Sequence, residues 1–82
     1  MSELVQTVFV VDDDASFLRS MQRLLRSSGY ANECFNSADD FLARCPPSAR
    51  GCVLADLQMP GMDGLALQAA LAQSADPLPV VF

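Results

Sequence analysis

The chain has 82 residues and a formal net charge of −5, with 51% hydrophobic and 18% charged residues. This length allows one small domain, and the hydrophobic content is too high for a disordered segment. No apolar run approaches the roughly 18 residues that a membrane span needs. The start, Met1-Ser2-Glu3, has neither the basic region nor the apolar core of a signal peptide. We therefore expect a cytoplasmic chain with no membrane segment.

Composition also excludes several classes of function. The negative charge argues against nucleic-acid binding by this chain, because phosphate contacts need clustered Lys and Arg, and there is no Lys. The absence of His excludes Ser-His-Asp and Cys-His catalysis. Three Cys without Cys-x-x-Cys spacing leave zinc without a plausible ligand set.

The first third of the chain passes from a strand pattern to a helix pattern. Val8 to Val11 is a short, continuous apolar run, as expected for a buried parallel strand. Apolar residues then recur at helical spacing between Phe17 and Leu25. Asp14 or Ser16 can cap the start of this helix, and Gly29 stands where it would end.

The same alternation continues to the last residue. A weaker strand is expected at Ala31 to Phe35, followed by a short helix that starts with the capping-box spacing Ser37 to Asp40 and ends at Pro46-Pro47. A buried strand at Cys52 to Ala55 comes next, and then a helix at Gly64 to Ser74, which Asp76 to Pro79 breaks. A fourth strand begins at Val80 to Phe82.

This order, βαβαβαβ, predicts an α/β fold with an open parallel sheet and helices on both faces. The carboxyl ends of all parallel strands lie at one edge of such a sheet. If the first and third strands are neighbours, the switch point lies between Val11 and Ala55. Asp12, Asp13 and Asp56 would then converge there.

Three close carboxylates repel one another, and a bound cation relieves this repulsion. Oxygen ligands without His or thiolate suit Mg²⁺, which often pairs carboxylates with a substrate phosphate. A carboxylate in such a site can attack phosphorus, and Asp56 is the candidate nucleophile. An acidic triplet after a strand is, taken alone, more often a helix cap with a solvated loop, and Asp63 before Gly64 has the same ordinary reading. The functional interpretation rests on acids after two buried strands together with the Met59-Pro60 turn.

Two motifs carry a family resemblance. The first motif is Val10-Val11-Asp12-Asp13, and the second is Asp56-Leu57-Gln58-Met59-Pro60-Gly61-Met62-Asp63-Gly64. Together they resemble the receiver domain of two-component response regulators, which has a flavodoxin/CheY-like fold. The segments Ser37 to Leu42 and Leu65 to Gln68 are similar to the FixJ-type branch, whose members usually carry a DNA-binding output domain further on.

The resemblance implies a function in phosphorelay signalling, as a phosphoacceptor domain and not an enzyme. Asp56 would receive the phosphoryl group from a phosphohistidine on a sensor histidine kinase. Asp13 and Asp56 would supply carboxylates to Mg²⁺, Gln58 its backbone carbonyl, and Asp12 a contact through water. Three consecutive acids allow either neighbouring pair to be the working one, and we favour Asp12 and Asp13 because they follow the apolar run directly.

The resemblance covers the whole chain, and residues 1–82 correspond to the N-terminal two thirds of a single receiver domain, ending in the fourth strand. The Ser or Thr, the aromatic residue and the Lys that receiver domains carry further on are not assignable here. The fourth strand would be an exposed apolar edge, so we expect self-association through Val80 to Phe82.

Two other functions stay open at this point. Asp12-Asp13-Asp14 could mimic the Asp-x-Asp motif of haloacid-dehalogenase-type phosphohydrolases, although Ser16 stands where that family has Thr or Val and the Met59-Pro60 turn is left unexplained. The chain could also be a binding module that dimerises through its exposed sheet and is never phosphorylated.

Overall fold

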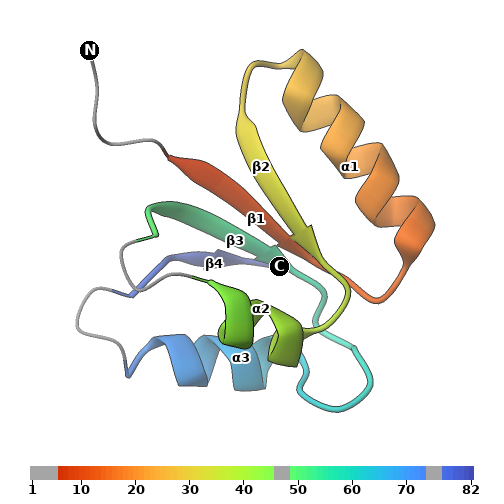
Figure 1. The fold of residues 1–82 in the computed structure, drawn as a ribbon. Coiled ribbons are helices and arrows are strands. Elements are labelled where there is room, and N and C mark those ends of the chain that lie inside the picture. Colours follow the sequence, from red (N-terminus) through yellow and green to blue (C-terminus); the bar gives the residue numbers. More distant parts are fainter. Residues whose placement is uncertain (1–5, 46–48, 74–76) are drawn as a thin grey trace.

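Four parallel strands form one sheet in the order β2-β1-β3-β4. The computed structural model describes residues 6–45, 49–73 and 77–82. In chain order the elements are β1 (Thr7–Val11), α1 (Ala15–Ser27), β2 (Ala31–Phe35), α2 (Ala38–Arg44), β3 (Gly51–Ala55), α3 (Gly64–Leu71) and β4 (Val80–Val81), as drawn in Figure 1. The predicted order βαβαβαβ and the predicted neighbours β1 and β3 are confirmed.

Some predicted boundaries were wrong by a few residues. β1 and β3 each begin one residue earlier than the apolar runs, at Thr7 and Gly51. The predicted third helix ran to Ser74, but α3 ends at Leu71, because Gln73 N–H already bonds back three residues to the Ala70 carbonyl. The proposed breakers at Pro46-Pro47 and Asp76, and Ser74 itself, lie outside the described residues.

Side chains that the sequence offers as caps fix where α1 begins and ends. Of the two candidates, Asp14 is the N-cap, and its Oδ1 accepts hydrogen bonds from Ser16 N–H (2.9 Å) and Phe17 N–H (3.3 Å). At the other end, Gly29 adopts a φ of 85°, in the left-handed region that stops a helix. α1 therefore starts directly after the acidic triplet.

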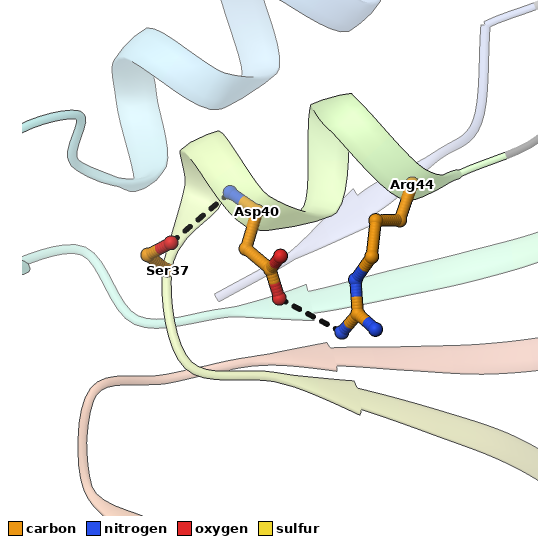
Figure 2. A network of polar contacts seen from close by, with 3 residues as sticks. All are labelled: Ser37, Asp40 and Arg44. Carbon is orange, nitrogen blue, oxygen red and sulfur yellow. Dashed lines mark hydrogen bonds and ion pairs between the residues drawn. The ribbon is translucent and has the colours of Figure 1, made fainter.

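The start of α2 is fixed in a similar way (Figure 2). Ser37 Oγ accepts a hydrogen bond from Asp40 N–H at 3.0 Å, which is the first half of the predicted capping box. The Asp40 carboxylate pairs with Arg44 one turn later, at 2.8 Å, and the Arg44 guanidinium lies 5.0 Å from the centre of the Phe35 ring. An exposed pair of this kind contributes about 0.3 to 0.5 kcal/mol.

The main core lies between the sheet and the helices α2 and α3, which Figure 1 shows together on one side of it. Phe41 from α2 packs edge to face against Phe9 and Phe35, with ring centres 5.6 Å and 5.2 Å apart. The other buried residues of this cluster are Val11, Ala38, Val53, Ala55, Met59 and Leu67. This core holds the two central strands, and hence the residues after them, in place.

The opposite face of the sheet is covered only in part. α1 packs mainly on β2 and less on β1 (Figure 1), and Val10 of β1 is completely buried. On β3, Cys52 and Leu54 are only half-buried, while Val53 and Ala55 on the other face are buried. Helices thus lie on both faces, as predicted, but β3 is not buried on both faces as its continuous apolar run suggested.

Candidate functional site

The strand register brings the two acidic segments together. β1 and β3 are neighbours and pair Val11 with Ala55, so the next residues, Asp12 and Asp56, leave the same edge of the sheet. The ladder continues past both strands, because Asp56 N–H donates to the Val11 carbonyl (3.2 Å) and Asp12 N–H donates to the Phe35 carbonyl (3.1 Å). From β1 the chain first adds β2 on one side of the sheet and then adds β3 on the other side, so the topological switch point lies between β1 and β3. Ligands of parallel α/β proteins bind at such points.

The carboxylates of Asp12, Asp13 and Asp56 form the cluster that the sequence predicted. One oxygen from each lies within 4.8 Å of the others, and Asp12 and Asp56 are half-buried while Asp13 is exposed. The described residues contain no other group of three potential metal ligands of this kind. Carboxylate oxygens without nitrogen or sulfur donors suit a hard divalent cation.

Asp12 accepts a backbone hydrogen bond in a tight turn, and the neighbouring carboxylates affect its pKa. Its Oδ1 accepts a hydrogen bond from Asp14 N–H at 2.9 Å. Burial raises the pKa of Asp12 above its ordinary value; the bond from Asp14 lowers this pKa, and the charges of Asp56 and Asp13 raise it further. The net pKa is raised, so negative charge on Asp12 is costly in the metal-free site.

The third acid of the triplet has a different role. Asp14 Oδ1 is bonded to two backbone N–H groups at the start of α1, and Asp14 is not in the carboxylate cluster. The general reading of an acidic triplet as a helix cap was therefore right for one residue of the three. The choice of Asp12 and Asp13 as the working pair stays a prediction.

Asp56 starts a short loop that returns the chain to α3. Its Oδ1 accepts a hydrogen bond from Gln58 N–H at 3.1 Å, which fixes the orientation of the carboxylate. The use of the Gln58 backbone carbonyl as a metal ligand stays a prediction. Asp63 closes the loop as the N-cap of α3, accepting from Ala66 N–H at 2.9 Å, as the sequence suggested.

The Met59-Pro60 turn is anchored by its methionine. Met59 is only 8% exposed and belongs to the core cluster beneath the site. Met62 packs against the same cluster, so the loop is attached to the core at two points. This gives a physical reason for a Met three residues after Asp56, which the sequence pattern alone did not reveal.

A cavity of about 370 Å³ adjoins the carboxylates. Its polar lining includes Asp12 and Asp56, and its apolar lining includes Phe17 from α1 and Val81 and Phe82 from the last strand segment. Sequence reasoning missed Phe17 and Phe82 as neighbours of the site. The helical period identified Phe17 as apolar, but nothing in the pattern placed it beside Asp56.

Among the helices within residues 6–45, 49–73 and 77–82, none is both long and apolar enough to cross a membrane.

Comparison with known proteins agrees with this geometry. The sequence model of the response regulator receiver domain matches residues 8–82. The response regulator protein TodT of Pseudomonas putida is 38% identical over 82 residues, which are 100% of this chain and 36% of TodT. The transcriptional regulatory protein FixJ of Bradyrhizobium diazoefficiens is 36% identical over 74 residues, which are 90% of this chain and 36% of FixJ. The solved structure of the response regulator StyR has a TM-score of 0.88 at 45% identity and covers 94% of this chain and 39% of StyR.

The parallel sheet and the acidic edge thus define a CheY-like signalling domain, and the chain belongs to the response regulator receiver domain family of two-component systems. FixJ is among its relatives, as the resemblance to the FixJ-type branch predicted. The chain spans about a third of the length of these curated relatives.

Proposed function

We propose that this receiver domain is phosphorylated on Asp56 in a reaction that depends on Mg²⁺. The observation that carries the proposal is the convergence of Asp12, Asp13 and Asp56 within 4.8 Å at the carboxyl edge of the sheet. Family membership supports the same role, because receiver domains are signalling domains that accept phosphoryl groups.

The residues present fit a magnesium ion. The cluster offers carboxylate oxygens only, and the raised pKa of Asp12 reflects burial and the repulsion that a cation would relieve. Asp13 and Asp56 would hold the ion through their carboxylates and Gln58 through its backbone carbonyl, and Asp12 would contact it through water. When bound, Mg²⁺ offsets negative charge on the transferring phosphoryl oxygens.

The transfer itself is a substitution at phosphorus. A carboxylate oxygen of Asp56 is the nucleophile, and the hydrogen bond from Gln58 N–H to Oδ1 orients the carboxylate. As the new O–P bond of an acyl phosphate forms, the P–N bond of a phosphohistidine donor breaks, and the imidazole leaves with the electron pair and takes up a proton from solvent. The open edge of the site, with exposed Asp13, gives the donor access.

The expected partners follow from the family. A sensor histidine kinase would supply the phosphoryl group, and a DNA-binding output domain elsewhere in the full-length protein would make the signal a change in transcription. A cytoplasmic location would suit both. Residues 1–82 themselves are not expected to bind nucleic acid, because their net charge of −5 repels the phosphate backbone.

Intact mass spectrometry tests the proposal. The chain is incubated with Mg²⁺ and acetyl phosphate beside an Asp56→Asn variant and a sample with excess chelator. We expect one phosphoryl adduct on the unaltered chain and none in either control. An adduct that persists in Asp56→Asn would assign the modification elsewhere, and no adduct on a chain with a folded circular dichroism spectrum would contradict phosphorylation of this chain.

The two alternatives receive less support. A phosphohydrolase with an Asp-x-Asp motif would use Asp12 and Asp14, but Asp14 Oδ1 is engaged in capping α1. Hydrolysis of p-nitrophenyl phosphate that Asp12→Asn abolishes would revive this alternative. A binding module that is never phosphorylated would keep its partners in Asp56→Asn. The feature that favours it is the edge of β4, which pairs with no further strand within the described residues.

A further inference from the structure

Gly64, the first residue of α3, lies against the backbone of Asp56. Gly64 is buried, and a Cβ atom added to it would lie 2.5 Å from the Asp56 carbonyl oxygen and 3.1 Å from the Asp56 carbonyl carbon. The same Cβ would lie 2.7 Å from Cε1 of the Phe82 ring. Distances under 3.0 Å are shorter than real Cβ contacts, so an alanine here requires something to move.

We infer that Gly64 is a positioning residue for Asp56: its missing side chain lets the first turn of α3 rest directly on the peptide group of the phosphoacceptor. The inference deepens the proposed function and rests on it for the role of Asp56, although the contact itself is independent of phosphorylation. Gly64 does not have a positive φ, so the requirement for glycine here is one of space and not of backbone conformation.

The two neighbours of Gly64 would respond differently to an added methyl group. Phe82 presents the end of a side chain that is 49% exposed, so its ring can move aside. The Asp56 backbone is held on its N-terminal side, because Asp56 N–H, in the peptide before Asp56, donates to the Val11 carbonyl on the neighbouring strand. A methyl group at position 64 would therefore push against the Asp56 carbonyl group.

The start of α3 is also held in place. Asp63 caps the helix through Ala66 N–H, and Gly64 N–H donates to the Leu57 carbonyl at 3.4 Å. Leu67, one turn into α3, is fully buried in the core, so the helix cannot move away from Asp56 without opening that core. The strain of a larger residue falls on the peptide after Asp56, which would displace the carboxylate relative to Asp12 and Asp13.

The experiment compares Gly64→Ala, Gly29→Ala and the double variant Gly64→Ala with Phe82→Ala in the full chain. Gly29 is the matched control, because a Cβ there meets nothing within 4 Å but suffers a φ of 85°, so Gly29→Ala destabilises the fold far from the site. Two quantities are measured by NMR: the backbone chemical shifts of Asp56 in the metal-free chain, and the affinity for Mg²⁺ by titration.

We expect Gly64→Ala to shift the Asp56 resonances and to weaken Mg²⁺ binding about 10-fold or more, as loss of supporting groups around metal ligands typically does. Gly29→Ala should leave both quantities unchanged despite its lower stability. The double variant should keep the defect, because removing the Phe82 ring leaves the contact with the Asp56 carbonyl. A Gly64→Ala chain that does not fold, and that Phe82→Ala does not rescue, would also support a rigid contact.

Two results would overturn the inference. One is a Gly64→Ala chain with unaltered Asp56 shifts and a Mg²⁺ affinity within twofold of the unaltered chain. The other is recovery of Mg²⁺ affinity or folding in the double variant, which would place the effect at Phe82. If the unaltered chain itself takes up neither Mg²⁺ nor a phosphoryl group, the proposed function fails, and the metal-free Asp56 shifts still decide the positioning role.

Discussion

At the scale of single residues, Asp12 and Asp56 lie close together because each directly follows one of the two central strands, β1 and β3. Acids after two buried parallel strands must lie at the same edge of a sheet, so the cluster needed only the right strand order. The close approach of Gly64 to the Asp56 backbone and the Phe82 ring depends on the path of the loop after Asp56 and on the position of the last strand. No local periodicity encodes such a contact, so only the folded structure reveals it.

The carboxylate cluster should destabilise the metal-free fold. We predict that Asp12→Asn raises the free energy of unfolding of the metal-free chain at pH 7 by on the order of 0.5 kcal/mol, because it removes one of several like charges in a partly solvated site. Urea unfolding with and without Mg²⁺ measures this, and Mg²⁺ should stabilise the unaltered chain more than the variant. A lower stability of metal-free Asp12→Asn would contradict the prediction.

The sign of the pH dependence follows from the same residue. Burial and the neighbouring charges raise the pKa of Asp12 in the folded chain above its ordinary value of 3.8, so the folded state holds this proton more tightly than the unfolded state. The contribution of Asp12 to stability is therefore greatest below pH 3.8 and is lost as pH rises through the raised pKa. The free energy of unfolding in urea is measured across this pH range for the unaltered chain and for Asp12→Asn. The difference between the two pH profiles gives the contribution of Asp12, which the variant should lack.

At the scale of elements, the helical period located α1 but did not reveal which apolar residues the fold covers. Leu18, Met21 and Leu25 are half-buried against the sheet, whereas Phe17 is 43% and Leu24 56% exposed. Periodicity measures how apolar residues are spaced around a helix, and the coverage depends on what packs beside it. In the part of the chain that the structure describes, α1 has β2 and β1 as its main neighbours.

Within the acidic triplet, Asp14 has a structural role as the N-cap of α1, whereas Asp12 and Asp13 belong to the proposed metal site. We predict that Asp14→Ala lowers the free energy of unfolding by about 1 kcal/mol, because Ser16 and Phe17 N–H lose their acceptor. Mg²⁺ affinity should stay within about twofold, whereas Asp13→Ala should weaken it strongly. Urea unfolding and Mg²⁺ titration of both variants measure this, with Asp14→Ser as the control that keeps a cap. Equal loss of Mg²⁺ affinity in Asp14→Ala and Asp13→Ala would show that Asp12 and Asp13 are not the working pair.

At the scale of the whole molecule, β4 leaves one edge of the sheet open within the described residues. Val80 and Val81 pair with Val53 and Leu54 of β3, and β4 ends the strand order on this side. Val81 is 50% exposed and Phe82 49%, so the edge combines unpaired backbone groups with apolar side chains. Such an edge favours pairing with a second chain.

We therefore predict that the 82-residue chain self-associates through β4. Light scattering should give a mass above that of the monomer that rises with concentration, and Val81→Lys should return it to the monomer value because a charged side chain disfavours strand pairing at an edge. Leu65→Lys is the matched control, since Leu65 is 59% exposed but lies on α3, and it should leave the association unchanged. A monomeric mass for the folded, unaltered chain at every concentration would contradict the prediction, and equal effects of the two Lys variants would assign the association to general hydrophobicity instead of strand pairing.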